Sequence, residues 1–265
     1  MPTAHAFADA ANVKLARAVH AAEVEVSTWP LRIAACIEPF SPHIAGFVSR
    51  IDIDAPLTLG FAAACALVHI LGAAFGFRFT VQYFSVSSMV RDFRPMYPLS
   101  YWRLVSHIFG HSSWEHLNSN MINLLLVGPA CEREFTTLGL TKIYLWTAVC
   151  SALAHMLLGA PDAAQLGASG LVFMLILLNS LLSARTGRYP LTFIVQVGLW
   201  VNKEVVAQML QHDKVSHIAH LSGALVGTVA GYQLHSDKVK AKAVAQWQAA
   251  RLFKQVPAKP RSKWF

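Results

Sequence analysis

The chain has 265 residues and a formal net charge of +8 at pH 7; 55% of its residues are hydrophobic and 14% are charged. With a mean hydropathy of +0.43, this composition favours an integral membrane protein over a soluble globular one. The four cysteines include no Cys-x-x-Cys pair, so the sequence indicates neither a disulfide framework nor a zinc knuckle. The excess positive charge lies in residues 236–265, which favours contact with anionic lipid headgroups over binding to nucleic acid.

Residues 1–55 form an arm that is too charged to span a membrane. Within it, residues 7–26 are rich in alanine and predict a helix, which the pair Trp29-Pro30 is expected to end. A position on the membrane surface is compatible with this composition. We therefore expect a cytoplasmic juxtamembrane arm that is separate from the rest of the chain.

Residues 56–235 contain six apolar segments, which predict an all-α, polytopic bundle of six membrane-spanning helices. The spans are expected at residues 57–76, 116–130, 140–159, 168–184, 190–208 and 215–234. An even number of spans places both termini on one side, and the basic tail at 236–265 makes that side cytoplasmic, as in a protein of the bacterial inner membrane.

Residues 77–115 connect the first predicted span to the second. This segment carries several arginines and many aromatic side chains, so it is too polar to span and too aromatic to be a solvated linker. We expect it to lie partly in the headgroup region. Trp102 and Arg103, which are adjacent in this connection, are interpreted first as interfacial anchors.

The motif Gly167-Ala168-Ser169-Gly170 opens the fourth predicted span. Gly167 permits a sharp turn, which would put Ser169 in the first turn of an apolar helix. Backbone N–H groups and the helix dipole would then favour the negative charge that develops when a serine attacks a carbonyl. By itself the motif is weak evidence, because small residues in membrane helices also serve close packing.

The sixth predicted span carries Ala219, Gly223, Gly227 and Gly231 at four-residue spacing, a stripe that lets another helix approach closely. His220 flanks this stripe near the outer end of the span. Two interpretations are open: His220 is the general base for Ser169, or it bonds a carbonyl group or a water molecule.

The second predicted span begins with His116 and Asn120, which lie four residues apart and therefore on one helix face. Both side chains can donate hydrogen bonds, as a developing oxyanion requires. The alternative is that they tie the long connection to the bundle, a role for which His111 is also a candidate.

These motifs, in this order, resemble the rhomboid family of intramembrane serine proteases. The resemblance covers about residues 57–234 and rests on Trp102, Arg103, His111, His116, Asn120, Gly167, Ser169, Gly170, His220, Gly223 and Gly227. It implies cleavage of transmembrane helices by a serine–histidine dyad, with Ser169 as nucleophile and His220 as base. It also implies an oxyanion hole made of Asn120, His116 and the backbone N–H of Ser169.

The resemblance further implies that Phe173 packs on the catalytic imidazole, and that single-span or polytopic membrane proteins are the substrates. It implies neither a cofactor nor a metal. The chain departs from the family at Met174 and Leu177, where many members carry glycine.

Two other functions are compatible with the sequence. One is a rhomboid-like protein that holds transmembrane clients without cutting them. The other is a membrane metalloenzyme with histidine ligands, suggested by the spacing of His107, His111 and His116 and by the pair His217 and His220. The second histidine group has only two members, and the sequence lacks a His-Glu-x-x-His motif.

Overall fold

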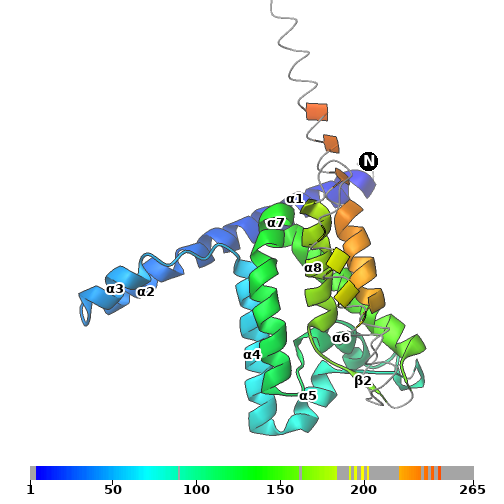
Figure 1. Ribbon diagram of the computed structural model, residues 1–265. Coiled ribbons are helices and arrows are strands. Elements are labelled where there is room, and N and C mark those ends of the chain that lie inside the picture. Colours follow the sequence, from blue (N-terminus) through cyan, green and yellow to red (C-terminus); the bar gives the residue numbers. More distant parts are fainter. Residues whose placement is uncertain are drawn as a thin grey trace, which may run out of the picture.

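The computed structural model describes residues 4–88, 90–160, 163–183 and 221–233, together with residues 191, 194–195, 198–199, 202, 236–237, 240–241 and 244–245. The described residues form a bundle of helices with a long arm at one end (Figure 1). Two of the described helices, α4 (Pro56–Phe75) and α7 (Trp114–Leu158), are long and apolar enough to cross a membrane. The prediction of a helical fold is therefore confirmed.

The arm consists of α1 (Ala4–Ser27), α2 (Trp29–Ile37) and α3 (Pro42–Val48). The helix predicted at residues 7–26 is present, and it ends before Trp29 as expected. Pro30 also occupies the first turn of α2, where its missing N–H costs no intrahelical hydrogen bond. In Figure 1, α1 crosses the end of the bundle where α4 begins, and α2 and α3 extend beyond it.

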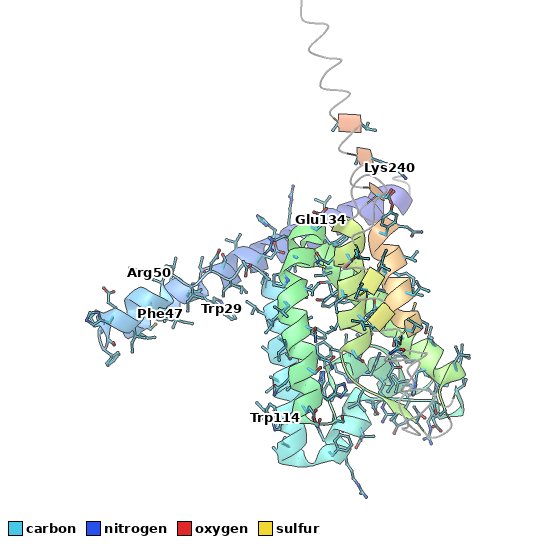
Figure 2. All side chains as sticks on the ribbon, viewed as in Figure 1. Trp29, Phe47, Arg50, Trp114, Glu134 and Lys240 are labelled. Carbon is cyan, nitrogen blue, oxygen red and sulfur yellow. The ribbon has the colours of Figure 1, made fainter. Side chains whose placement is uncertain are left out.

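Helix α7 is 45 residues long, more than one span needs. It reverses direction at Thr136, which has φ 64° and ψ 156° and separates residues 114–135 from residues 137–158. Figure 2 labels Trp114 and Glu134 at opposite ends of the first limb. The two limbs correspond to the second and third predicted spans, at residues 116–130 and 140–159, and Thr136 lies in the interval between them.

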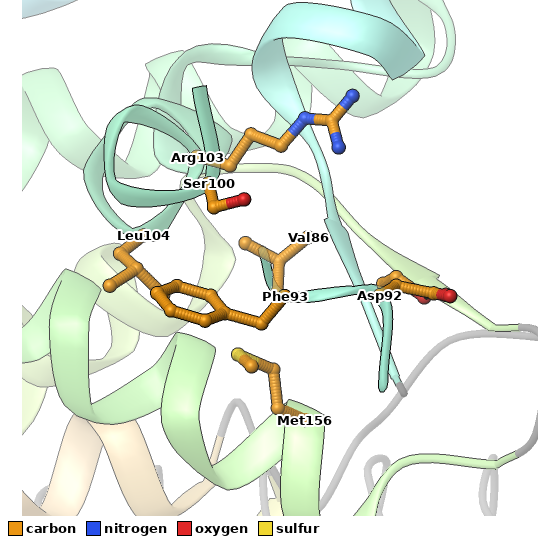
Figure 3. Close-up of a pocket in the computed structure, with 8 residues that line it drawn as sticks. Val86, Asp92, Phe93, Ser100, Arg103, Leu104 and Met156 are labelled. Carbon is orange, nitrogen blue, oxygen red and sulfur yellow. The ribbon is translucent and has the colours of Figure 1, made fainter. Parts of the chain in front are cut away.

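The connection at residues 77–113 folds into a compact layer against the end of the bundle. It contains α5 (Phe77–Phe84), β1 (Val86–Ser87), η1 (Val90–Asp92), α6 (Pro98–Ser106) and η2 (His107–Phe109). Phe93 and Leu104 pack with Met156 of α7 around a cavity of about 30 Å³ (Figure 3). This packing fixes the connection on the second limb of α7.

Strand β1 pairs antiparallel with β2 (Ala164–Gln165), with Val86 opposite Gln165. The prediction of an all-α fold missed this pairing. Each strand has only two residues, which is too short to show the alternation by which strands are recognised in a sequence.

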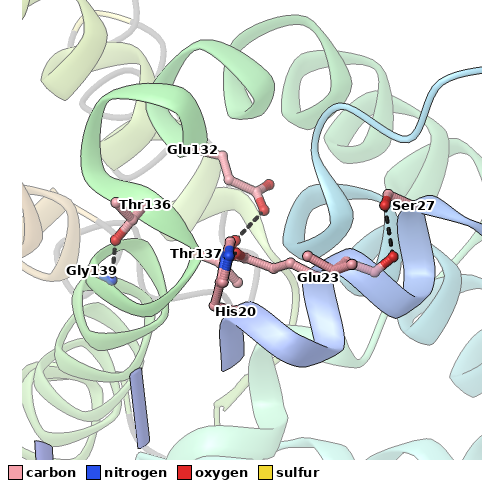
Figure 4. Close-up of polar contacts among 8 residues, drawn as sticks. His20, Glu23, Ser27, Glu132, Thr136, Thr137 and Gly139 are labelled. Carbon is pink, nitrogen blue, oxygen red and sulfur yellow. Dashed lines mark hydrogen bonds and ion pairs between the residues drawn. The ribbon is translucent and has the colours of Figure 1, made fainter. Parts of the chain in front are cut away.

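The buried carboxylate of Glu132 joins the reversal of α7 to the beginning of α4. Figure 4 shows its contact with Thr137 at the reversal. One oxygen accepts from the Leu57 N–H at 2.8 Å and the Thr137 hydroxyl at 2.9 Å; the other accepts from the N–H and hydroxyl of Thr58 at 2.9 and 2.8 Å. A carboxylate at this position satisfies N–H groups that the first turn of a helix leaves without partners. Helix α1 contacts both α4 and α7 beside this junction.

The predicted glycine stripe is confirmed for its three described members. They lie against the second limb of α7 and against α8 (Ser169–Ser183), and the contacts are Gly223 with Ser151, Gly227 with Thr147 and Met174, and Gly231 with Ile143 and Leu178. A Cβ at Gly227 would lie 2.7 Å from the Cγ of Met174, too close for a side chain without movement. The helix at residues 221–233 therefore supplies the small residues at a contact where α8 carries methionine.

Several predictions concern residues outside the described part of the chain. They include the fourth member of the stripe, Ala219, and most of the basic tail at 236–265. Of the predicted fifth span, the structure describes residues 191, 194–195, 198–199 and 202, all of them helical and exposed. The number of six spans and the domain boundaries remain predictions.

Candidate active site

Ser169 is the first residue of α8, and Gly167 forms the turn that leads into it. Gly167 has φ +122°, a backbone conformation that residues other than glycine rarely adopt. A Cβ at this position would also lie 2.7 Å from Cε1 and 2.8 Å from Nε2 of His116. Glycine is thus required here by the backbone conformation and by the approach of an imidazole ring.

The segment before Ser169 is held by backbone hydrogen bonds to the long connection. Besides the pairing of β2 with β1, the Ala163 carbonyl accepts from the Ser88 N–H at 3.0 Å, and the Gly167 N–H donates to the His107 carbonyl at 2.9 Å. These bonds come from residues more than fifty positions away in the chain. The connection therefore sets the position of the turn in front of the serine.

His111 makes a further contact with this turn through its side chain. Its ring is buried, and Nε2 accepts from the Ala168 N–H at 3.5 Å while Nδ1 lies 3.2 Å from the Phe109 carbonyl oxygen. These two contacts require a neutral ring that carries its proton on Nδ1. Burial, followed by the charge on a protonated His116, lowers the pKa of His111 to about 3.

His116 stands in the first turn of α7, beside the serine turn. Its backbone N–H donates to Ser113 Oγ at 3.1 Å, an N-cap contact that begins the helix at this point. Its Nδ1 lies 3.1 Å from Ser112 Oγ, and its ring faces the ring of His111 with centroids 5.0 Å apart. Its Cε1–Nε2 edge is the part of the ring that approaches Gly167.

Asn120 lies one turn after His116 on α7, and its side chain is buried. Its Nδ2 would be 3.8 Å from a Cβ at Gly167, so the amide faces the serine turn. Among the described residues, Nδ2 has no hydrogen-bond partner. A buried donor without a partner is unfavourable by roughly 1–3 kcal/mol, and a catalytic role is one of the explanations for such a group.

The remaining predicted site residues on α8 are buried. Gly170 follows Ser169 directly, and Phe173 lies one turn further on, within a core that includes Leu171, Met174 and Leu175. Phe173 therefore lies one helical turn after Ser169 on the same helix, α8.

Trp102 and Arg103 lie on α6, and their hydrogen bonds connect α6 to α5. Trp102 Nε1 donates to the Tyr83 carbonyl at 2.9 Å, and Arg103 Nε donates to the Gln82 carbonyl at 2.6 Å. The Trp102 side chain is half exposed. These two residues hold the connection together and leave an indole ring at its surface, as expected for an interfacial anchor.

His220 lies outside the described residues, so its distance from Ser169 is not part of the structure. The described helix begins at the next residue, Leu221, which packs against the main hydrophobic core. Gly223 and Gly227 fix that helix against α7 and α8. The helix that follows His220 is therefore a direct neighbour of the helix that begins with Ser169.

Residues 98–237 match the Rhomboid domain, a stretch of just over half the chain that includes Ser169 and His220. The chain belongs to the rhomboid family. This membership makes it an integral membrane protein. The family resemblance inferred from the motifs is thus confirmed.

Several relatives of this rhomboid are similar over about half of the chain or more. Rhomboid-like protein 11, chloroplastic, of Arabidopsis thaliana is 32% identical over 143 residues, which are 49% of this chain and 51% of the relative. RHOMBOID-like protein 12, mitochondrial, of the same plant is 26% identical over 209 residues, 71% of this chain and 61% of the relative. An uncharacterized protein of Mycobacterium tuberculosis is 29% identical over 198 residues, 70% of this chain and 77% of the relative. The chain thus spans about half to three-fifths of the length of the two plant rhomboids.

In this rhomboid, two of the histidines that suggested a metal site, His111 and His116, contact protein groups, whereas His217 and His220 lie outside the described residues. Both ring nitrogens of His111 contact backbone groups, and His116 Nδ1 contacts a serine hydroxyl. In the part of the chain that the structure describes, no group of three or more His, Cys, Asp or Glu side chains is arranged to hold a metal ion. The ring contacts of His111 and His116 thus lie at the serine turn and at the beginning of α7.

Sequence reasoning missed two contacts of the serine turn. The first is the His107 carbonyl on the Gly167 N–H, a backbone contact that no residue pattern signals. The second is the side-chain contact in which Gln165 Nε2 donates to Ser151 Oγ of α7. A signal for the second was available, because Gln165 and Ser151 are polar residues within or beside apolar segments.

Proposed function

We propose that the chain is an intramembrane serine endopeptidase that cleaves transmembrane helices of membrane proteins with a Ser169–His220 dyad. The observation that carries the proposal is the buried amide of Asn120, which faces the turn before Ser169 and has no acceptor among the described residues. A donor in this position is suited to an oxyanion that forms when the neighbouring serine attacks a peptide carbonyl.

The chemistry begins with Ser169 Oγ. His220 removes its proton as Oγ attacks the scissile carbonyl, and the carbonyl oxygen becomes an oxyanion. Asn120 Nδ2, His116 and the Ser169 N–H donate to this oxygen. His220 then gives the proton to the leaving amine, and a water molecule activated by the same imidazole hydrolyses the acyl-enzyme.

The environment of the turn supports this assignment. Ser169 opens α8, so the positive end of the helix dipole and the N–H groups of the first turn lie beside the reacting atoms. Gly167, Ala168 and their partners on the long connection hold this arrangement before any substrate binds. A preorganised set of donors stabilises the transition state without reorganising during the reaction.

The proposed orientation has both termini in the cytoplasm and the site toward the outer leaflet. In Figure 1, the arm, the reversal of α7 and the end of the helix at 221–233 share one end of the bundle. The long connection and the beginnings of α7 and α8 lie toward the other end. A substrate helix would thus be cut near its outer end, in the membrane of a bacterial cell.

A fluorophosphonate probe, which reacts with activated serines, tests the proposal on the full chain in detergent. We expect labelling of the wild type and its loss in Ser169→Ala and in His220→Ala. Ser119→Ala is the matched control, because Ser119 is an exposed serine on α7 and its loss leaves labelling unchanged. Cleavage of a membrane substrate retained in Ser169→Ala would disprove the serine mechanism. A folded wild type that is never labelled would favour the client-binding alternative.

A further inference from the structure

Helices α2 and α3 form a hairpin whose large apolar side chains are mostly exposed. Phe40, in the turn between them, is 89% exposed, and Phe47 on α3 is 69% exposed. Other exposed apolar residues of the hairpin are Trp29, Leu31, Ile33 and Ile44. Figure 2 shows Trp29 and Phe47 on the part of the arm that extends beyond α4.

The contact between the two helices buries little. Within the hairpin, only Pro30, Ala34 and Ala45 are buried. Helices of nine and seven residues are too short to be stable alone in water. Three small side chains bury too little apolar surface to offset the entropy of ordering some twenty residues. The hairpin therefore requires a partner for its exposed apolar surface.

The position of the hairpin in the chain restricts which partner can cover it. Val48 ends α3, and Pro56 begins α4, the first membrane-spanning helix. The seven residues between them reach at most about 25 Å when fully extended. Ala55, next to α4, is buried, which ties this linker to the bundle. The hairpin is thus held beside the point where α4 enters the bilayer.

The side chains of the hairpin are those found at a membrane surface. Trp29, Ile33 and Ile37 are spaced by four residues and share one face of α2. Arg32 on α2 and Arg50 just after α3 provide exposed charges next to this apolar surface. Tryptophan beside arginine is typical of the boundary between headgroups and acyl chains.

We propose that the α2–α3 hairpin is an interfacial membrane anchor. It lies in the plane of the leaflet at which α4 begins, with Trp29, Phe40 and Phe47 among the acyl chains and Arg32 and Arg50 at the headgroups. The partner is the lipid bilayer itself. The inference rests on the membrane insertion of α4 and α7 and is independent of the proposed peptidase activity.

Spin labels on single cysteines test this anchor in liposomes of phosphatidylcholine and phosphatidylglycerol. Exposed Cys36 and half-buried Cys150 are replaced by serine, whereas Cys65 and Cys131 are buried and stay. Labels are then placed by Phe40→Cys or Phe47→Cys, and by Lys14→Cys on exposed α1 as the control. The relaxation of each spin label is then measured with oxygen, which concentrates in lipid, and separately with a water-soluble nickel complex. The ratio of the two accessibilities reports whether the label lies in lipid or in water.

We expect the ratio of oxygen to nickel accessibility to be several-fold higher at residues 40 and 47 than at residue 14. Equal ratios at the three positions would overturn the proposal. Spin–spin broadening at residue 47 that disappears on dilution with unlabelled chain would also overturn it, because a second copy of the chain would then cover the hairpin.

A double variant of the hairpin provides a second test that does not depend on spin labels. Phe40→Asp/Phe47→Asp leaves the bundle intact and disfavours insertion into the acyl region. Trypsin cleavage after Arg32 and Arg50 in liposomes should become several-fold faster in this variant than in the wild type. An unchanged cleavage rate would contradict the anchor.

Discussion

The imidazole of His111 accepts a hydrogen bond from the backbone N–H of Ala168 at 3.5 Å, so a histidine of the long connection holds the residue directly before Ser169. The contact requires an unprotonated Nε2, and the Phe109 carbonyl at 3.2 Å from Nδ1 holds the complementary proton. A protonated ring would present two donors and lose the contact with Ala168. The position of the serine turn is therefore linked to the protonation state of His111.

This link predicts that stability falls in mild acid. The pKa of His111 is about 3 in the folded protein, owing first to burial, against 6.5 for an unperturbed imidazole. The unfolded state thus binds the proton more readily, and the contribution of neutral His111 is complete above pH 6.5 and is lost as the pH falls toward 3. By pH 5 the loss is about 2 kcal/mol.

Unfolding in detergent micelles between pH 7.5 and 5 measures this loss. His111→Gln is the control, because glutamine accepts from the Ala168 N–H without titrating. The unfolding free energy of the wild type should decline more steeply with falling pH than that of the variant. Parallel curves would mean that His111 does not contribute to the pH dependence.

Replacement of Asn120 by alanine should separate catalysis from folding. Asn120 Nδ2 has no partner among the described residues, so Asn120→Ala removes no hydrogen bond that the structure gives to Nδ2. If the amide donates to an oxyanion, turnover of a membrane substrate should fall by ~10²–10³-fold while the melting temperature changes little. Asn118→Ala, at an exposed position two residues earlier on α7, should leave both unchanged. A large loss of stability with proportionate loss of activity would instead indicate a structural role.

The bundle could be predicted from the sequence because its signals are local. Apolar length defines α4 and the two limbs of α7, and Glu132 marks the reversal since a charged residue does not continue a span. The glycine stripe is likewise a local pattern, and the structure confirms its function as a contact surface. Each of these features can be recognised within about twenty consecutive residues.

The geometry around Ser169 could be predicted only in part, because several of its determinants are distant in sequence. His116 and Asn120 were identified from their four-residue spacing, and the structure brings both to the turn at Gly167. The His107 carbonyl and the pairing of β1 with β2 depend on backbone groups, which every residue carries and no residue type marks. The exposure of apolar side chains on α2 and α3 could not be predicted either, because it depends on which other helices the arm contacts in the folded protein.

Removal of the Glu132 side chain should destabilise the whole bundle. Its carboxylate accepts four hydrogen bonds that join the start of α4 to the reversal of α7, and two of them come from backbone N–H groups. Glu132→Ala leaves these donors without their acceptor at a buried site, which should lower the unfolding free energy by about 2–4 kcal/mol. Arg133→Ala removes only an exposed ion pair with Asp54 and should change it by about 0–1 kcal/mol. Equal effects of the two changes would show that the buried carboxylate does not join these helices.

A methyl group at Gly227 should displace the helix that follows His220. The added Cβ would meet Thr147 and lie 2.7 Å from Met174 Cγ, so Gly227→Ala should cost about 1–3 kcal/mol of stability. It should also lower probe labelling of Ser169, if His220 activates that serine from this helix.

Thr147→Ala removes the closest atom and should restore part of both losses when combined with Gly227→Ala. Val229→Leu, at a half-exposed position on the same helix, is the matched control for added volume and should be neutral. Unchanged stability in Gly227→Ala would mean that the helix at residues 221–233 does not pack on α7 and α8 through this glycine.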